Sequence, residues 1–519
     1  MPDILSAYAA SQPDKLAVID DRPDGEIVSW TYAELEAESN RLANALASLG
    51  AGPGRKVIWC GPNSLQIVSC VNATRKIGAV AVPLNYRLTQ EEARYIVAHS
   101  DAHIAYVDAE YAHLFGSADG EPAQQGSLRH VLVFGGSAPA GTLGEDVVAS
   151  ASSEPPEEVQ PGAGGATMIY TSGTTGKPKG AVRRTRDEAV VIGLITLIGY
   201  QPDDIYITSG PLYHSGPGSF MQIGQALGQT IIIQRKFDPQ DWLRLVDAYK
   251  VTSTFSAPAL IRMICALPAE VKDRYDKTSM KRMIANAAPW SFALKQAYLA
   301  DFPADSLWEI YGSTELGVNC LLEPKDQLRK PGSCGKPAPY NEIVLLDADG
   351  NEVTGTGPEN PGELYVRSGG VFNEYYKQAD SYESARRGEF HTVGDIAYRD
   401  DEGYYYICDR KNDMIISGGM NIYPAEIEAA LEQHPAIYDV AVFGIPSEEW
   451  GELVHATIVV APDASLTPDE VIAFSRQHLA GYKTPRSVAF ADELPRTGSG
   501  KILKRQMRAP YWEGQTASL

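Results

Sequence analysis

A stretch rich in glycine, hydroxyl and lysine residues has the composition of a phosphate-binding loop. It reads YTSGTTGKPKG from Tyr170 to Gly180 and begins at the end of the apolar run 167–170. Its glycines let backbone N–H groups approach a ligand closely, its hydroxyls add donors and its lysines add positive charge, which suits a polyphosphate. The Walker A spacing occurs neither here nor elsewhere in the chain. A solvated loop between strands is the alternative, and the density of donors favours phosphate.

Two carboxylates and a lysine further along the chain could serve the same ligand. Glu315 ends the segment YGSTE at 311–315, and Mg²⁺ prefers hard oxygen ligands of this kind. Asp395 ends TVGD, and a carboxylate can accept hydrogen bonds from two ribose hydroxyls. Lys501 follows TGSG, a flexible mount from which a compact cation could stabilise an α-phosphoryl group under attack. Taken singly, Glu315 and Asp395 are equally consistent with turn or edge residues, and Lys501 with a solvated basic tail.

The order of these and further motifs resembles the adenylate-forming superfamily, which comprises acyl- and aryl-CoA synthetases, beetle luciferases and nonribosomal adenylation domains. The resemblance covers nearly the whole chain and is closest to fatty-acyl or aryl-CoA ligases. A single match could arise by chance, but this many in order could hardly do so. In chain order the motifs are WTYAEL (30–35), KIGAVAVP (76–83), the loop at 170–180, PLYHS (211–215), YGSTE (311–315), TVGD (392–395), DR (409–410), SGGMNIYPAEIE (417–428) and PRTGSGK (495–501).

The resemblance implies a role for each motif and implies that ATP, Mg²⁺ and coenzyme A are bound. It places Mg²⁺ on Glu315, adenine against Tyr311 and ribose on Asp395 and Arg410. It implies catalytic roles for Lys501, Thr314, Glu315 and His214, with His214 positioning the carboxylate pocket and not acting as a base. The residues expected to contact these ligands are Thr171, Ser172, Gly173, Thr174, Thr175, Gly176, Lys179, Asn286, Ala287, Ala288, Tyr311, Gly312, Asp395, Arg410, Gly418 and Gly419.

Two positions depart from the family's pattern. Asn412 stands where the hinge usually carries Asp or Lys, but Asn adopts unusual backbone angles readily, so a swivel is retained. Arg183, Arg184, Thr185 and Arg186 stand where many relatives have Thr-His. This second departure leaves the packing behind the phosphate loop open, although it does not remove the donors of the loop.

Alternating helix and strand signals surround these motifs. Capping boxes at Thr31 with Glu34 and at Thr89 with Glu92 predict two helices, the first ending near Gly50. Strands are predicted at 56–60, 79–84 and 104–108, and their alternation with helices indicates a largely parallel sheet. Short β-like runs with glycine turns fill 333–408. A compact unit follows from about 412, with a helix that starts at 467–470 and stops by Gly481.

These signals predict an α/β protein of two domains. We expect a large multi-subdomain amino-terminal α/β domain over residues 1–411, which includes a β-rich subdomain. We expect a small mobile carboxy-terminal α+β domain over residues 412–519, which carries Lys501.

Composition excludes several other classes. The 519 residues are 44% hydrophobic and 21% charged, as in a soluble globular protein. The net charge of −21 argues against nucleic acid and anionic lipid as partners. The six scattered cysteines argue against a disulfide framework, and no H-x-x-x-H pair or G-x-S-x-G elbow supports a zinc enzyme or serine hydrolase. The sequence shows no secretory signal or transmembrane run, so we expect a cytoplasmic protein; a homodimer is left open.

The expected reaction has two half-reactions: a carboxylate attacks ATP to give acyl-AMP and pyrophosphate, and coenzyme A then accepts the acyl group. The acid is expected to be hydrophobic, because the segments expected to line its pocket (213–222, 286–290 and around 311) carry no obvious cation or acid for the charged ends of an amino acid. Fatty, aryl and steroid-type acids stay open. The alternatives are an adenylation enzyme that loads a carrier protein in trans and a non-catalytic acyl- or nucleotide-binding relative.

Overall fold

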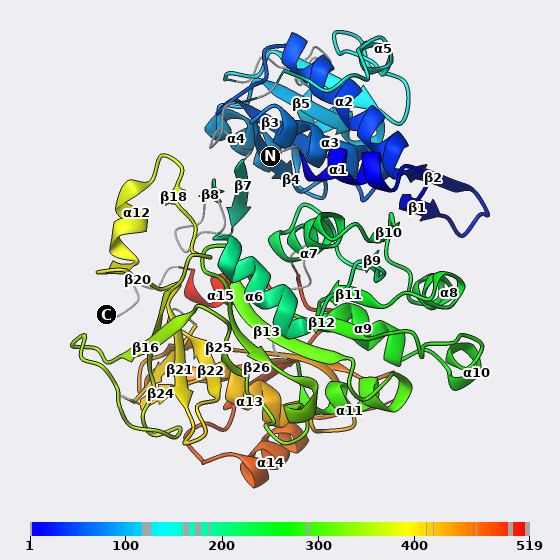
Figure 1. The fold of residues 1–519 in the computed structure, drawn as a ribbon. Coiled ribbons are helices and arrows are strands. Elements are labelled where there is room, and N and C mark those ends of the chain that lie inside the picture. Colours follow the sequence, from blue (N-terminus) through cyan, green and yellow to red (C-terminus); the bar gives the residue numbers. More distant parts are fainter. Residues whose placement is uncertain are drawn as a thin grey trace.

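The computed structural model describes residues 3–116, 126–157, 159, 166–171, 178–184, 187–286, 290–411, 413–418, 420–462, 464–496 and 502–513. The strands within these ranges form four sheets, of nine, seven, six and five strands. Figure 1 shows the seven-stranded sheet at the top, the nine-stranded sheet at the right and the six-stranded sheet at the lower left. The mixed α/β architecture with a smaller carboxy-terminal unit confirms the fold class predicted from the sequence.

The seven-stranded sheet carries the segment predicted to bind phosphate. Its order is β18-β8-β7-β4-β3-β5-β6. The strands from β7 to β6 run parallel, as the sequence predicted, whereas β7, β8 and β18 form an antiparallel edge. The strands are β3 (Lys56–Cys60), β4 (Val80–Leu84), β5 (Ile104–Asp108), β6 (His130–Phe134), β7 (Ala166–Thr171), β8 (Lys179–Arg183) and β18 (Glu374–Tyr375).

Two of the helices associated with this sheet, α2 and α4, begin where the sequence predicted. At α2 and α4 the capping threonines, Thr31 and Thr89, accept a hydrogen bond from the third helical N–H, and the glutamate there accepts one from the threonine N–H. Because both orphan donors are satisfied, these starts are fixed locally. The elements are α1 (Ile4–Ser11), α2 (Tyr32–Ser48), α3 (Leu65–Lys76), α4 (Gln90–Ser100), α5 (Asp146–Ala149) and the 3₁₀ helix η1 (Ala109–Phe115).

The nine-stranded sheet places several motifs at one edge. Its order is β15-β14-β13-β12-β11-β9-β10-β1-β2, and β9 to β13 run parallel. Ligands of such sheets bind at the carboxyl ends of the strands, which here precede Asn286 and include Tyr311. The strands are β1 (Leu16–Asp21), β2 (Ile27–Thr31), β9 (Ile205–Thr208), β10 (Thr230–Ile233), β11 (Ser253–Ser256), β12 (Arg282–Ala285), β13 (Leu307–Ser313), β14 (Gly317–Leu322) and β15 (Lys336–Pro337).

One apolar core joins the two large sheets. It combines Trp59 and Phe134 of the first sheet with Ile231 and Ile284 of the second, and Leu42 of α2 belongs to the same cluster. Burial of this surface fixes the two sheets relative to each other, since close-packed interiors resist sliding. The remaining helices of this part are α6 (Glu188–Ile198), α7 (Ser215–Ala226), α8 (Pro239–Tyr249), α9 (Pro258–Cys265), α10 (Ala269–Lys272) and α11 (Phe292–Asp301).

The six-stranded sheet corresponds to the predicted β-rich stretch. Strands β19, β20, β17, β21 and β22 follow one another, and β16 pairs with β17. Its core contains Leu345, Leu364 and Val366. The elements are β16 (Glu342–Leu346), β17 (Gly362–Arg367), β19 (Arg386–Arg387), β20 (Phe390–His391), β21 (Asp395–Arg399), β22 (Tyr405–Arg410), α12 (Ala379–Ser384) and η2 (Pro324–Asp326).

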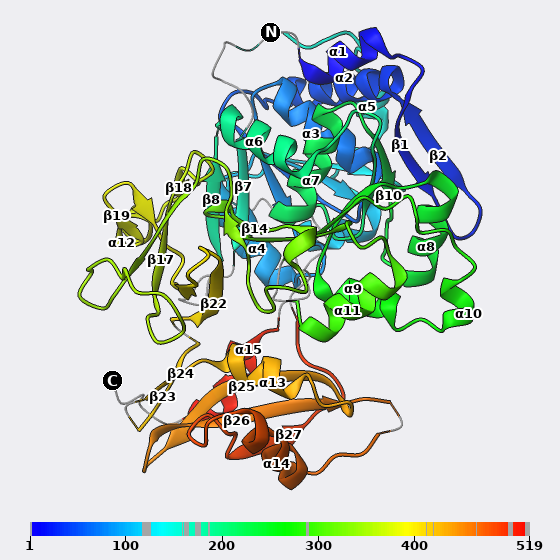
Figure 2. The same cartoon turned by 60° about the horizontal axis from the view of Figure 1, so that its bottom comes forward.

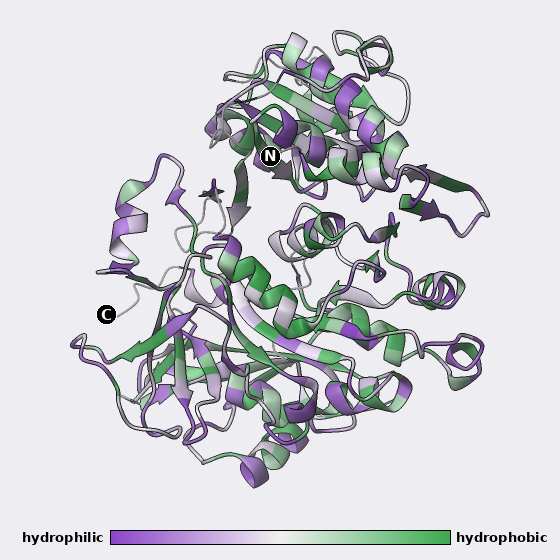
Figure 3. Ribbon diagram, viewed as in Figure 1, coloured by the Kyte–Doolittle hydropathy of each residue, from purple (hydrophilic) through white to green (hydrophobic). Residues whose placement is uncertain are grey.

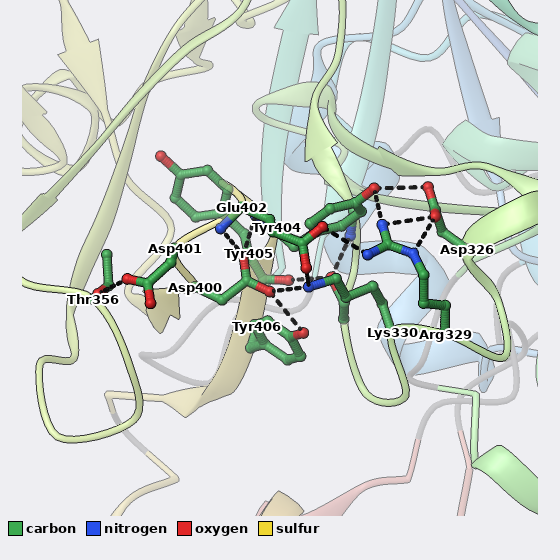
Figure 4. Close-up of polar contacts among 12 residues, drawn as sticks. Asp326, Arg329, Lys330, Thr356, Asp400, Asp401, Glu402, Tyr404, Tyr405 and Tyr406 are labelled. Carbon is green, nitrogen blue, oxygen red and sulfur yellow. Dashed lines mark hydrogen bonds and ion pairs between the residues drawn. The ribbon is translucent and has the colours of Figure 1, made fainter.

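A polar network holds the β21–β22 hairpin against the loop that follows β14 (Figure 4). Lys330 Nζ lies 2.7 Å from the Asp400 carboxylate at the hairpin turn. The Tyr404 hydroxyl donates to Asp326 at 2.7 Å and accepts from Arg329 at 2.8 Å. The far ends of the same two strands carry Asp395 and Arg410. The network therefore anchors one end of the hairpin whose other end enters the candidate site.

The five-stranded sheet lies apart from the other three, below them in Figure 2. Its core includes Ile422, Val442 and Ile458. Helix α14 again starts at a capping box, on Thr467, and ends at His478, three residues before the predicted Gly481. The elements are β23 (Ile415–Ser417), β24 (Met420–Ile422), α13 (Pro424–Leu431), β25 (Ile437–Ser447), β26 (Gly451–Val460), α14 (Pro468–His478), β27 (Ser487–Phe490) and α15 (Lys504–Trp512).

Arg262 of α9 links this unit to the rest of the molecule. Its Nη1 donates to the Tyr438 carbonyl oxygen at 2.5 Å, and its Nη2 lies 3.7 Å from the Glu432 carboxylate. All six cysteines have free thiols, so none of them forms a disulfide. Within the described ranges no helix has the length and apolar character needed to cross a membrane.

Candidate functional site

The segment 311–315 forms the centre of the candidate site. It runs from the end of β13 into the turn to β14, and Gly312 allows the two strands to approach each other closely. A Cβ on Gly312 would lie 1.9 Å from the Gly317 carbonyl oxygen, so no larger residue fits there. The Asn286 side chain donates to the Ile310 carbonyl at 2.8 Å and fixes the strand end just before the segment.

Asp395 and Arg410 lie on the adjoining β21–β22 hairpin and face Tyr311. The Tyr311 hydroxyl donates to Asp395 Oδ2 at 2.5 Å, and Arg410 Nε lies 3.3 Å from Asp395 Oδ1. Asp395 and Arg410 are direct cross-strand partners, which sets their spacing. The structure thus brings together three of the residues expected to bind the nucleoside. Each carboxylate oxygen keeps further acceptor capacity for a ribose hydroxyl.

Glu315 is buried and receives two hydroxyl hydrogen bonds on one oxygen. Thr171 Oγ1 donates to Glu315 Oε1 at 2.9 Å, and the Tyr375 hydroxyl donates to the same atom at 3.1 Å. Burial, together with the Glu315 charge, raises the pKa of Tyr375, so its hydroxyl stays protonated and acts as the donor. The other carboxylate oxygen, Oε2, receives no donor from the described residues.

This arrangement suits a divalent cation held largely by substrate oxygens. No group of three or more His, Cys, Asp or Glu side chains among the described residues could enclose a metal. Mg²⁺ is usually held by one or two carboxylates together with phosphate oxygens and water. Glu315 Oε2 therefore fits a Mg²⁺–ATP contact of the kind predicted from the sequence.

Thr314 and Lys179 also form hydrogen bonds with neighbouring elements. The Thr314 hydroxyl lies 2.8 Å from the Ser215 hydroxyl at the start of α7. Lys179 Nζ donates to Ser381 at 3.2 Å and stands 5.3 Å from the centre of the Tyr375 ring. Both predicted residues therefore belong to the same cluster as Glu315.

An open cavity adjoins the 312–314 end of this segment. With its mouth it encloses about 990 Å³ of empty space, and its walls are mainly apolar. One wall is α6, most of which is hydrophobic in Figure 3. Thr314 and Ser215 lie at its polar end. The apolar walls include Val190, Val191, Leu194, Phe220, Phe255 and Ile310.

His214 lies beside this cavity and lines a second one of about 670 Å³, which shares Ser215 with the first. Burial and then the positive charge of Arg87 lower the pKa of His214 to about 4. Its Nε2 is shielded from solvent and has no hydrogen-bond partner among the described residues. The imidazole is therefore neutral at physiological pH, and its positional role stays a prediction.

Gly418 lies in the carboxy-terminal unit, where its backbone conformation requires glycine. Its φ is +58°, and a Cβ there would approach the Trp450 ring to 2.8 Å. Its N–H donates to the Trp450 carbonyl at 2.8 Å.

The other predicted site residues, and the predicted hinge residue, lie outside the described residues: Ser172, Gly173, Thr174, Thr175, Gly176, Ala287, Ala288, Asn412, Gly419 and Lys501.

Sequence reasoning missed one helix and three side chains that contribute to this site. Tyr375 comes from β18, far along the chain, and no local pattern distinguishes it from Tyr376 beside it. Helix α6 lies outside the segments expected to line the acyl pocket, although its sequence is strongly apolar. Arg183 and Asp187 line the cavity, which therefore has a polar margin that the expected lining segments did not include.

Comparisons with known proteins place the chain in a family. Residues 5–376 match the AMP-binding enzyme model, and 426–501 match the AMP-binding enzyme C-terminal domain. Feruloyl-CoA synthase of Amycolatopsis sp is 34% identical, over 93% of this chain and 94% of its own. Long-chain-fatty-acid–CoA ligase FadD13 of Mycobacterium tuberculosis is 31% identical, over 98% of each. The o-succinylbenzoate CoA synthetase of Bacillus subtilis, solved with its acyl-adenylate, matches with a TM-score of 0.80 at 27% identity, over 98% of each chain.

The chain therefore belongs to the AMP-binding enzyme family, the adenylate-forming superfamily that its motifs resemble. The prediction of an enzyme, an acid–thiol ligase, is confirmed at the level of this family. The roles of individual site residues stay predictions.

The low pKa of His214 predicts a pH-dependent loss of stability. Between pH 6.5 and 4 the unfolded chain binds a proton at this position that the folded chain does not, so the free energy of unfolding falls as the pH drops. His214→Gln removes this effect and should reduce the loss between pH 7 and pH 5 by on the order of 1–2 kcal/mol. Urea titrations at both pH values measure it. Exposed His113→Gln is the control, and an unchanged loss in His214→Gln would contradict the burial argument.

The Tyr375 hydroxyl should matter for binding of Mg²⁺-ATP. Tyr375→Phe keeps the ring but removes a donor to the Glu315 carboxylate, so the rise in melting temperature caused by Mg²⁺-ATP should shrink and Kd should rise about tenfold. Tyr376→Phe is the matched control, because that hydroxyl donates to Asp101 on another part of the sheet. Equal ligand responses in the two variants would show that Tyr375 does not orient Glu315.

Proposed function

We propose that this chain is an ATP-dependent CoA ligase that activates a hydrophobic carboxylic acid as acyl-AMP and then forms the thioester with coenzyme A. The observation that carries this proposal is the position of Thr314, which belongs both to the 311–315 segment and to the lining of the apolar cavity. An acid whose apolar part fills the cavity presents its carboxylate next to Thr314 and Glu315. That is where the α-phosphate of a nucleotide held by Tyr311, Asp395 and Arg410 would lie.

In the first half-reaction, a carboxylate oxygen attacks the α-phosphorus of ATP, and the bond to the β-phosphate oxygen breaks to release pyrophosphate. Asp395 and Arg410 hold the ribose, and the Tyr311 ring packs against adenine. The donors of 171–180 hold the β- and γ-phosphates. Bound at Glu315 and the phosphates, Mg²⁺ would neutralise negative charge on the leaving pyrophosphate. Lys501 stabilises the charge that develops on the α-phosphoryl oxygens.

In the second half-reaction, the unit beyond residue 412 turns, withdraws Lys501 and brings the loop at Gly418 towards the acyl-adenylate. The thiol of coenzyme A attacks the acyl carbon, and AMP leaves with the electron pair of the broken C–O bond. Activation makes this feasible, because AMP is a far better leaving group than the oxide of a free carboxylate. The hydrogen bond from the Gly418 N–H to the Trp450 carbonyl supports this role, since it fixes Gly418 within the unit.

The cavity walls favour an apolar acid. The named relatives act on feruloyl, long-chain-fatty and o-succinylbenzoyl groups, which supports a carboxylic acid substrate with a large apolar part. A cytoplasmic location is part of the proposal, and the oligomeric state is left open as a monomer or a homodimer.

A panel of carboxylic acids tests this function directly. Purified protein with Mg²⁺-ATP should release pyrophosphate with alkanoic and aryl-substituted acids and give at least tenfold lower kcat/KM with free amino acids, whose charged ammonium would be buried in an apolar cavity. Addition of coenzyme A should convert the acid to its thioester. Pyrophosphate release without transfer to coenzyme A, but with transfer to a carrier protein, would support the carrier-loading alternative. Nucleotide binding without pyrophosphate release would support a non-catalytic relative.

Lys501→Ala separates the two half-reactions. Loss of one electrostatic stabiliser should lower acid-dependent pyrophosphate release by about 10²–10³-fold. Thioester formation from chemically supplied acyl-adenylate should stay near the wild-type rate, because that step does not use the side chain. Lys325→Ala, at a solvent-exposed lysine paired with Glu323, is the control for general effects. Wild-type adenylation in Lys501→Ala would refute the assignment.

A further inference from the structure

Arg183 joins three segments of the site. It is the last residue of β8. Its Nη2 donates to the Thr314 carbonyl at 2.8 Å, and its Nη1 donates to the Gly370 carbonyl. Thr314 belongs to the turn between β13 and β14, and Gly370 to the turn between β17 and β18. One guanidinium group therefore links the hairpin of β7 and β8, called here the phosphate-loop hairpin, to two turns from distant parts of the chain.

The two residues whose carbonyl groups accept from Arg183, Thr314 and Gly370, also make contacts with other parts of the site. The Gly370 carbonyl oxygen lies against Gly317, where a Cβ would approach it to 2.9 Å. The Thr314 hydroxyl is bonded to Ser215. The peptide plane between Thr314 and Glu315 therefore has little freedom to rotate while Arg183 holds its carbonyl, and this plane sets the direction in which the Glu315 side chain leaves the backbone.

The β7–β8 hairpin contacts this pair of residues at both of its ends. Thr171, at the loop end of β7, pairs with Lys179 and donates to Glu315. Arg183, at the far end of β8, pairs with Thr167 and donates to Thr314. A tilt or shift of the hairpin would lengthen one of these hydrogen bonds. These two hydrogen bonds therefore hold β7 and β8, the strands on either side of residues 172–177, in a fixed position relative to Glu315.

An arginine is suited to this position for a geometric reason. Its planar guanidinium directs separate N–H groups at two acceptors, whereas a lysine ammonium offers one compact charge on a flexible stem. Hydrogen bonds from a charged donor are also about twice as strong as neutral ones. Arg184, the next residue, differs: its side chain is 61% exposed and pairs with Glu374.

We propose that Arg183 is a positioning residue for the adenylation step, which keeps the phosphate-loop hairpin and the Thr314–Glu315 peptide in the geometry needed for attack on ATP. The proposal rests on the proposed function, since it assigns Arg183 to one of its two half-reactions. It does not make Arg183 a contact of the reacting atoms. The second half-reaction, which needs neither triphosphate nor Glu315, does not depend on this alignment.

The test compares Arg183→Gln and Arg183→Lys with the control Arg184→Gln. Misplacement of catalytic groups by about 1 Å can lower a rate about 10²-fold, so kcat for acid-dependent pyrophosphate release should fall about 10–10²-fold in Arg183→Gln. KM for ATP should change less than about threefold, as expected for an interaction that acts in the transition state. Thioester formation from supplied acyl-adenylate should stay within about threefold of wild type. Arg183→Lys should recover at most part of the lost kcat.

The outcomes separate this proposal from a structural role and from failure of the proposed function. Equal losses in both half-reactions, or losses that parallel a lower melting temperature, would overturn the positioning role, as would full rescue by Arg183→Lys. If the wild type releases no pyrophosphate with any acid, the proposed function fails. The adenylation role of Arg183 then fails with it. In an active enzyme, a Mg²⁺-ATP melting shift that is reduced in Arg183→Gln but not in Arg184→Gln would show an effect on ground-state binding of the nucleotide, and this would contradict a role confined to the transition state.

Discussion

The site depends on one constraint: the polar groups of residues 310–315 find their partners on other elements rather than within the segment. The Ile310 carbonyl accepts from Asn286, the Thr314 carbonyl from Arg183, and the Glu315 carboxylate from Thr171 and Tyr375. Buried polar groups without partners are costly, so this segment reaches its shape only when the surrounding elements are in place. The segment therefore needs the assembled fold in addition to its own sequence, which supplies Gly312 and the local hydrogen bond from the Leu316 N–H to the Ser313 hydroxyl.

The same assembly separates the two kinds of chemistry that an acid-activating enzyme needs. Apolar side chains of α6 and β13 line the cavity, and the hydroxyls of Thr314 and Ser215 lie at its polar end. The chain carries a formal net charge of −21, yet the site presents local donors such as the hydroxyls of Thr171 and Thr314. Local geometry, and not the total charge, therefore decides what this site accepts.

Features that depend on residues close together in the sequence could be predicted, whereas features that depend on residues far apart in the chain could not. The capping boxes at Thr31 and Thr89 are complete within four residues, and the helices begin there as predicted. Motif residues such as Tyr311 and Asp395 were predicted by resemblance, and the structure brings them together. Tyr375 lies 60 residues from Glu315 and 1 residue from Tyr376, which faces elsewhere. Only the pairing of β18 with β8 distinguishes these two tyrosines, and no local pattern encodes that pairing.

The shorter of the two contacts that Arg262 makes with the carboxy-terminal unit is to a main-chain atom, the Tyr438 carbonyl oxygen. Every residue type supplies the same carbonyl oxygen, so substitutions of the Tyr438 side chain leave this acceptor in place. The arginine, in contrast, is needed for its own chemistry. Mutational tolerance at this contact is therefore unequal: the hydrogen bond needs the Arg262 side chain but survives substitution at Tyr438, which would remove only the contact of Arg262 with the tyrosine ring.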